Sequence, residues 1–143
     1  AETTFNEDLT DPAALEGELW PLCEKLAAKA RRDGVASRVV VLKLRRPDFK
    51  IVTRRVTTGD PVQTARGLFA AARALLKPEL GQPYRLIGVG MADIQDAEDA
   101  PASLFESSEA RILKTERAID ALRDRFGSAA VVAGRAIEPS PRR

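Results

Sequence analysis

The fold is decided by residues 38–58, which read RVVVLKLRRPDFKIVTRRVTT. Apolar and polar side chains alternate through residues 38–46, which predicts a half-buried strand whose outward face is basic. Pro47 and Asp48 supply turn residues, and residues 49–58 return as a second strand. The stretch therefore predicts a β-hairpin.

The alternation also assigns faces to the second strand. Thr53, Arg55 and Thr57 share the outward face, whereas Arg54 falls between two valines on the other face. A charged residue in an apolar row points to a bulge or a twist near Arg54. The outward face of the predicted hairpin carries polar and basic side chains, namely Lys43, Arg45, Thr53, Arg55 and Thr57.

Before the hairpin, residues 2–5 favour a short strand. Asp11 followed by Pro12 is a typical helix start. Four leucines then recur at three- and four-residue steps, namely Leu15, Leu19, Leu22 and Leu26, which predicts an amphipathic helix. Gly34 is expected to end it. Pro21 lies inside this helix and predicts a kink or a break.

After the hairpin, Asp60 and Pro61 repeat the helix start, and apolar spacing predicts a second helix that stops at Pro78. Residues 83–91 favour another strand. The acidic stretch that follows lacks periodicity and is expected to be an exposed loop. Ser108 is expected to cap a third helix ended by Gly127, followed by a short strand over residues 129–133.

The order strand, helix, strand, strand, helix, strand is typical of split βαβ folds. We therefore predict an α+β domain, with a four-stranded sheet, two helices on one face and a C-terminal helical extension. Its expected parts are the sheet domain over residues 1–92, an acidic loop over 93–108, a helix and short strand over 109–137, and a disordered tail over 138–143.

The composition is that of a soluble globular protein, with 143 residues, 44% of them hydrophobic and 31% charged. There is no phosphate-binding Gly-Lys-Ser/Thr loop, no HExxH and no histidine. We therefore expect no catalysis and no metal site in this chain itself. A single cysteine, Cys23, and the lack of a bilayer-length apolar run or signal-like start lead us to expect a cytoplasmic protein without a membrane partner.

Charge is segregated along the chain. Seven acids and no base precede residue 25, seven bases and one acid lie between Arg38 and Thr58, and six acids and no base lie between Asp93 and Glu109. Such a basic block indicates a polyanionic partner, although a solvated surface is the alternative.

Phosphate groups are bound by Lys and Arg, by hydroxyls and by backbone N–H groups. The outward hairpin face offers the first two kinds. Gly88 and Gly90 could expose the third, or could only relieve crowding within the sheet. Tyr84 is the one aromatic residue expected near this face, so duplex phosphates fit better than stacked bases. Binding independent of base sequence follows.

Four segments in order resemble one known family. They are residues 2–9 (ETTFNEDL), 41–54 (VLKLRRPDFKIVTR), 84–89 (YRLIGV) and 125–131 (RFGSAAV). Together they resemble the little finger domain of Y-family translesion DNA polymerases, the bacterial DNA polymerase IV group above all. The resemblance covers roughly residues 2 to 135.

The resemblance implies a sheet that lies against the primer–template duplex and holds its phosphates. By position, it implies DNA contacts from eleven residues: Thr3, Thr4, Lys43, Arg45, Thr53, Arg54, Arg55, Thr57, Arg85, Gly88 and Gly90. It also implies a parent polymerase, acting in DNA repair and replication, whose catalytic core is a partner of this domain. Any Mg²⁺ would belong to the absent palm domain, so we expect no cofactor in this chain. We expect a monomer in the bacterial nucleoid.

The family also docks on the sliding clamp through a peptide that ends in a hydrophobic pair. Ser103, Leu104 and Phe105 occupy the expected place, although the usual glutamine is missing. The alternative is that Leu104 and Phe105 pack on the third helix.

Two other functions remain open at this point. One is the same domain in a catalytically inactive, clamp-binding relative. The other is a protein-interaction module whose open sheet face binds an acidic partner.

Overall fold

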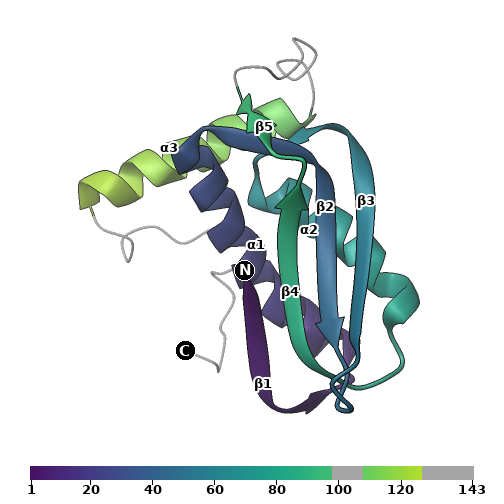
Figure 1. The fold of residues 1–143 in the computed structure, drawn as a ribbon. Helices are drawn as coiled ribbons and strands as arrows, with labels where there is room; N and C mark the ends of the chain where they lie inside the picture. Colours follow the sequence, from purple (N-terminus) through teal and green to yellow (C-terminus); the bar gives the residue numbers. More distant parts are fainter. Residues whose placement is uncertain (98–107, 127–143) are drawn as a thin grey trace.

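A computed structural model describes residues 1–97 and 108–126 of the chain. The elements follow the order β1 (Glu2–Leu9), α1 (Pro12–Asp33), β2 (Val35–Arg45), β3 (Ile51–Val62), α2 (Ala65–Leu76), η1 (Lys77–Glu79), β4 (Tyr84–Ala92), β5 (Gln95–Asp96) and α3 (Ser108–Phe126). The predicted α+β class is confirmed, and so is the third helix. Figure 1 shows the sheet with α1 and α2 behind it.

The sheet has the strand order β1-β4-β2-β3, and every neighbouring pair is antiparallel. The short strand β5 pairs separately with the start of β2. Each helical crossover therefore joins two parallel strands that have one antiparallel strand between them. This is the split βαβ arrangement that the element order predicts.

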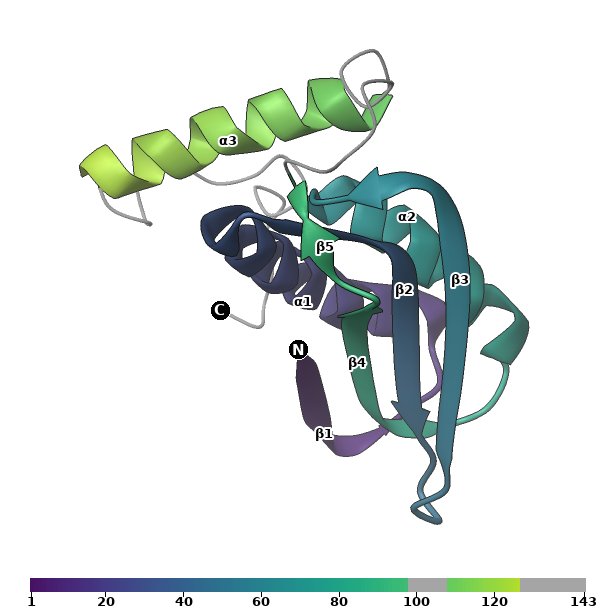
Figure 2. The same ribbon diagram turned by 45° about the horizontal axis from the view of Figure 1, so that its top comes forward.

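The hydrophobic core lies between the sheet and the two long helices. Alternate residues of β2 and β4 point into it, and Leu42, Leu44 and Ile87 are at most 1% exposed. From the helices, Trp20 and Phe69 meet edge to face with ring centroids 5.3 Å apart. Because α1 and α2 cover only this face, the other face of the sheet stays open (Figure 2).

The start of α2 differs from the sequence prediction. Asp60 and Pro61 do not begin the helix; they are the last part of β3, and Thr64 is the N-cap, accepting a bond from the Gly67 amide. Proline is tolerated because β3 is an edge strand, where a missing N–H breaks no ladder. A cap-plus-proline pattern was therefore misleading here.

Neither the expected break at Pro21 nor the expected bulge near Arg54 is present in the structure. Pro21 does not break α1, which is helical from Pro12 to Asp33 and ends at Gly34 in the left-handed conformation. The ladder between β2 and β3 is regular around Arg54, and its register shift lies between Ser37 and Val39. At this shift the Ser37 hydroxyl donates to the Val39 carbonyl and accepts from the Val39 amide.

Candidate nucleic-acid interface

The open face of the sheet is basic and hydroxyl-rich. Cross-strand pairing sets Lys43 opposite both Thr53 and Gly88, and it sets Val41 opposite Arg55. Side chains of one ladder rung point to the same face, so these residues lie together. Nine of the predicted contact residues lie on β2, β3 and β4. Seven of these nine share the open face with Thr4 of β1: Lys43, Arg45, Thr53, Arg55, Thr57, Gly88 and Gly90.

Two cations of this face already hold carboxylates. Lys43 Nζ lies 3.1 Å from Glu2 Oε1, and Arg55 Nη2 lies 3.6 Å from Asp93 Oδ2. All four side chains are more than a third exposed. Exposed pairs of this kind are worth little, so an incoming phosphate can replace the carboxylates.

Arg45 differs from the other two cations because it has no ion-pair partner among the described residues. Its guanidinium lies 5.8 Å from the centre of the Phe49 ring, at the tip of the β2–β3 hairpin. Phe49 is 76% exposed and adopts a positive φ of 70°. An exposed aromatic at this edge was missed by the sequence analysis, because alternation says nothing about a turn.

The two glycines of β4 have different structural reasons. A Cβ on Gly88 would lie 2.9 Å from Glu2 Cβ and 3.1 Å from the Ala1 carbonyl oxygen, so Gly88 lets β1 pack closely. A Cβ on Gly90 would meet nothing within 4 Å. Relief of crowding therefore explains Gly88, whereas Gly90 leaves the backbone of β4 uncovered.

Three of the predicted DNA contacts lie elsewhere. Thr3 pairs with Ile87 and so faces the helices. Arg54 shares its rung with the core residue Leu42 and reaches Glu79 of η1 at 3.3 Å. These side chains point away from the open face, as the strand alternation had already indicated for Arg54.

Arg85 is the third of these residues, and its guanidinium is held by β1. Arg85 Nε donates to the Phe5 carbonyl at 2.9 Å and Nη2 donates to the Asn6 carbonyl at 3.2 Å, while Asp8 lies 3.4 Å away. These bonds span the irregular part of the β1–β4 ladder between Thr4 and Leu9. Arg85 thus stabilises the strand where its regular pairing is interrupted.

On the other side of the molecule, α3 is held by a network of carboxylates. Glu116 accepts from the Ala65 and Arg66 amides at 2.9 and 3.4 Å and also pairs with Arg31. Asp120 completes the contact, 2.7 Å from Arg31 Nε. The first turn of α2 contains no acid of its own, so α3 supplies the negative charge that its N-terminus favours.

Glu109 extends this network to the N-cap of α2. Its carboxylate accepts from the Gln63 amide at 2.8 Å and from the Thr64 hydroxyl at 2.7 Å. Burial raises the pKa of Glu109 above its ordinary value, although these hydrogen bonds act in the opposite direction. Burial also lowers the pKa of Arg31, but its bonds to Asp120 and Glu116 outweigh that effect and leave the Arg31 pKa raised.

Cys23, the single cysteine of the chain, is a core residue. Cys23 is fully buried, and burial, with the nearby Glu24, raises the pKa of its thiol to about 12, so it is no nucleophile.

Ser103, Leu104 and Phe105 lie outside the described residues. Within residues 1–97 and 108–126, no helix has the length and apolar character needed to cross a bilayer.

Comparison with known proteins agrees with this geometry. Residues 1–104 match the family described as the impB/mucB/samB family C-terminal domain. A solved structure described as a complex of the β-clamp processivity factor and the little finger domain of PolIV superposes with a TM-score of 0.50 and 26% identity, covering 66% of this chain and 88% of that chain. The fold is thus that of a polymerase little finger domain.

The chain belongs to the impB/mucB/samB C-terminal domain family. A DNA polymerase IV of Caulobacter vibrioides is 60% identical over 139 residues, covering 96% of this chain. DNA polymerase IV 1 of Mesorhizobium japonicum is 42% identical over 136 residues, covering 94% of this chain. The chain spans only about a third of these relatives, 34% and 31% of their lengths.

Proposed function

We propose that this chain is the DNA-holding little finger domain of a bacterial translesion polymerase, and that it binds duplex DNA through its open sheet face without reading the base sequence. The observation that carries the proposal is the grouping of Lys43, Arg45 and Arg55 on that face while helices cover the other. The similarity to DNA polymerase IV supports it. The polymerase reaction would belong to the part of the parent protein outside this chain.

The chemistry of the face fits phosphate better than base edges. Its donors are two kinds of cation and the exposed hydroxyls of Thr53 and Thr57. Such groups bind phosphate oxygens of any sequence, whereas base reading needs side chains that enter a groove. The unobstructed backbone at Gly90 allows the duplex to approach β4 closely.

The test is a charge reversal of the three cations. The triple variant Lys43→Glu, Arg45→Glu, Arg55→Glu is expected to lose duplex binding in a fluorescence anisotropy titration while keeping its circular dichroism spectrum and melting temperature. Wild-type affinity is expected to fall steeply as salt rises, because bound phosphates release counterions. Duplex binding by the triple variant equal to that of the wild type would show that the face is not the interface.

Lys25, Lys77 and Lys114 provide a matched control, since all three are exposed and lie off the open face. Their triple replacement by Glu changes the net charge by the same amount. We expect this control to lose a little duplex affinity because its net charge is lower. The open-face variant is expected to lose much more. Equal losses in the two variants would indicate nonspecific attraction to net charge alone.

Clamp docking is a second proposed activity, favoured because the solved little finger domain described above is in complex with a β-clamp. We expect the double variant Leu104→Ala, Phe105→Ala to weaken binding to a bacterial sliding clamp and to leave duplex affinity unchanged. Surface plasmon resonance with immobilised clamp measures the first quantity. Unchanged clamp affinity would remove these two residues from the contact.

A further inference from the structure

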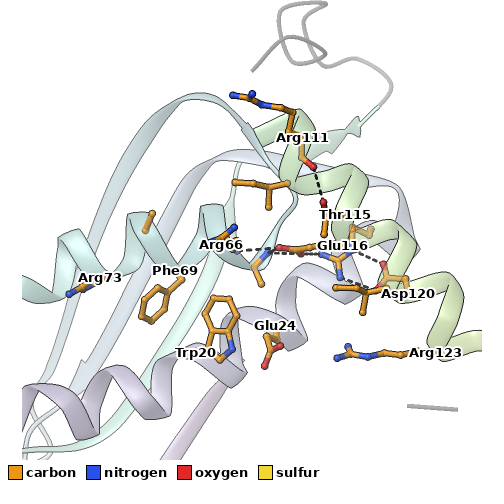
Figure 3. A pocket seen from close by; sticks show the side chains of 15 residues that line it. Trp20, Glu24, Arg66, Phe69, Arg73, Arg111, Thr115, Glu116, Asp120 and Arg123 are labelled. Carbon is orange, nitrogen blue, oxygen red and sulfur yellow. Dashed lines mark hydrogen bonds and ion pairs between the residues drawn. The ribbon is translucent and has the colours of Figure 1, made fainter. Parts of the chain in front are cut away.

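Three helices enclose a cleft on the side of the molecule that the sheet does not reach. α1, α2 and α3 all contribute to it, and its volume is about 730 Å³. Figure 3 shows side chains of the three helices converging on this space. The volume falls within the range of about 300–1,000 Å³ that is typical of ligand sites.

The wall of the cleft is partly apolar. Trp20 and Phe69 line it from α1 and α2 (Figure 3), and Ile112 and Ile119 line it from α3. The Trp20 indole Nε1 is buried and has no hydrogen-bond partner among the described residues. Buried polar groups are seldom left unpaired, so this donor marks a place where an acceptor is missing.

The rim of the cleft is cationic. Five arginines line it against three carboxylates, those of Glu24, Glu116 and Asp120. Two of these carboxylates are held by Arg31. Arg66 and Arg111 are exposed, and neither makes an ion pair within the described part of the chain. Both guanidinium groups are therefore available to an anionic ligand at the rim of the cleft.

The shape of the aromatic pair decides between classes of ligand. Trp20 is only 9% exposed and meets Phe69 edge to face, so little ring surface is available for stacking a nucleobase. Ile112 and Ile119 of α3 are only half-buried, so an aliphatic or aromatic side chain can cover apolar area there. We propose that this cleft binds an acidic peptide segment of a partner protein, with one bulky apolar side chain against Ile112 and Ile119 and carboxylates at Arg66 and Arg111.

Trp20 is the only tryptophan of the chain, so its fluorescence reports on the cleft directly. The probe is the synthetic peptide acetyl-Asp-Glu-Leu-Phe-Asp-Glu-amide, titrated into the 143-residue protein. We expect a saturable change in Trp20 emission that weakens as salt rises. The same peptide with lysines in place of its acids, or with alanines in place of Leu and Phe, is expected to cause no saturable change.

The variant that tests the rim is Arg66→Gln with Arg111→Gln, which keeps the size of both side chains. It is expected to weaken peptide binding about tenfold or more, as loss of two charge-assisted contacts would. Lys25→Gln with Lys114→Gln is the matched control, because both lysines are exposed on helices that form the cleft, α1 and α3, and neither lines it. The control is expected to bind the acidic peptide as wild type does.

Three outcomes of the peptide titrations would overturn the proposal. They are no saturable emission change, equal binding of the lysine peptide, and equal weakening in both double variants. A short single-stranded oligonucleotide that bound the cleft in place of the peptide would also overturn it. Duplex affinity of the Arg66 and Arg111 variant is expected to stay unchanged, so failure here is distinguishable from failure of the sheet-face proposal.

Discussion

At the scale of single residues, the carboxylates of the open face oppose the proposed activity. Glu2 and Asp93 each contact a cation that is proposed to bind phosphate. Their negative charge lowers the potential of the face, and any phosphate that reaches Lys43 or Arg55 has to displace them. These two acids therefore offer a test in which binding should improve.

Glu2→Gln combined with Asp93→Asn is expected to tighten duplex binding by about 2- to 20-fold at low salt, because two exposed ion pairs no longer compete with DNA. Anisotropy titration measures the change. Glu7→Gln with Asp124→Asn, which alters two exposed acids that form no ion pair with Lys43 or Arg55, is expected to have a smaller effect. Weaker binding by the first variant would mean that Glu2 and Asp93 position the cations rather than mask them.

Glu109 gives a pH dependence whose sign is set by its raised pKa. The folded state holds the proton more tightly than the unfolded chain does, so the free energy of unfolding falls as pH rises through the range just above the ordinary glutamate pKa. Glu109→Gln removes this contribution. As pH rises from about 4 to 7, the free energy of unfolding of the variant is expected to increase relative to that of the wild type in urea unfolding experiments.

Asp124→Asn on the same helix serves as the control, since Asp124 is exposed. Its difference from the wild type is expected to stay constant over that pH range. A constant difference for Glu109→Gln as well would contradict the assigned pKa shift.

At the scale of elements, the contact between β1 and β4 depends on the missing side chain of Gly88. Gly88→Ala forces a Cβ against Glu2 and the Ala1 carbonyl, and we expect a loss of about 1–3 kcal/mol in the free energy of unfolding. Gly90→Ala, with nothing in its way, is expected to change stability by less than about 0.5 kcal/mol. Urea unfolding distinguishes the two, and equal effects would contradict the packing assigned to Gly88.

Element types could be predicted from sequence wherever periodicity is local. Strands β2, β3 and β4 and all three long helices were foreseen, because each repeats its apolar residues over two or more turns or pleats. The strand alternation also separated Thr53 and Arg55 from Arg54. What alternation cannot supply is the position of a strand within the sheet, which is why Pro61 looked like a helix start rather than part of an edge strand.

The docking of α3 onto α1 and α2 also could not be predicted from the sequence, and the reason is different. Glu109, Glu116 and Asp120 look like ordinary solvated acids in the sequence, spaced so that they share one side of a helix. Their partners are the Arg31 guanidinium and the first amides of α2, which come close only in the folded chain. No local pattern marks such contacts, so the candidate site on the sheet was found and the helical cleft was not.

At the scale of the whole molecule, the open sheet face and the α3 network lie on different sides. A mutation can therefore disrupt one of them without disturbing the other. Glu116→Ala leaves the Ala65 and Arg66 amides unpaired and leaves Arg31 buried with one partner fewer. We expect a cost of about 3–5 kcal/mol in the free energy of unfolding, the range for breaking a buried ion pair. Duplex affinity is expected to be unchanged under conditions where the variant is folded.

Hydrogen exchange locates the effect of Glu116→Ala. Faster exchange is expected in the first turn of α2 and not in β2 or β3. Exchange that quickened equally in all elements would mean that α3 stabilises the domain globally and that the two sides are coupled.

The capping of α2 by α3 also has a consequence for the order in which the domain is completed during protein synthesis. Residues 1–97 contain every described strand of the sheet and both of its covering helices, and they leave the ribosome before α3 does. Until Glu116 emerges, α2 starts with two amides that lack their acceptor, and Arg31 lacks its carboxylates. A nascent chain therefore acquires its hydrophobic core before it acquires the charges that complete α2, and α2 reaches its full stability only after α3 has emerged.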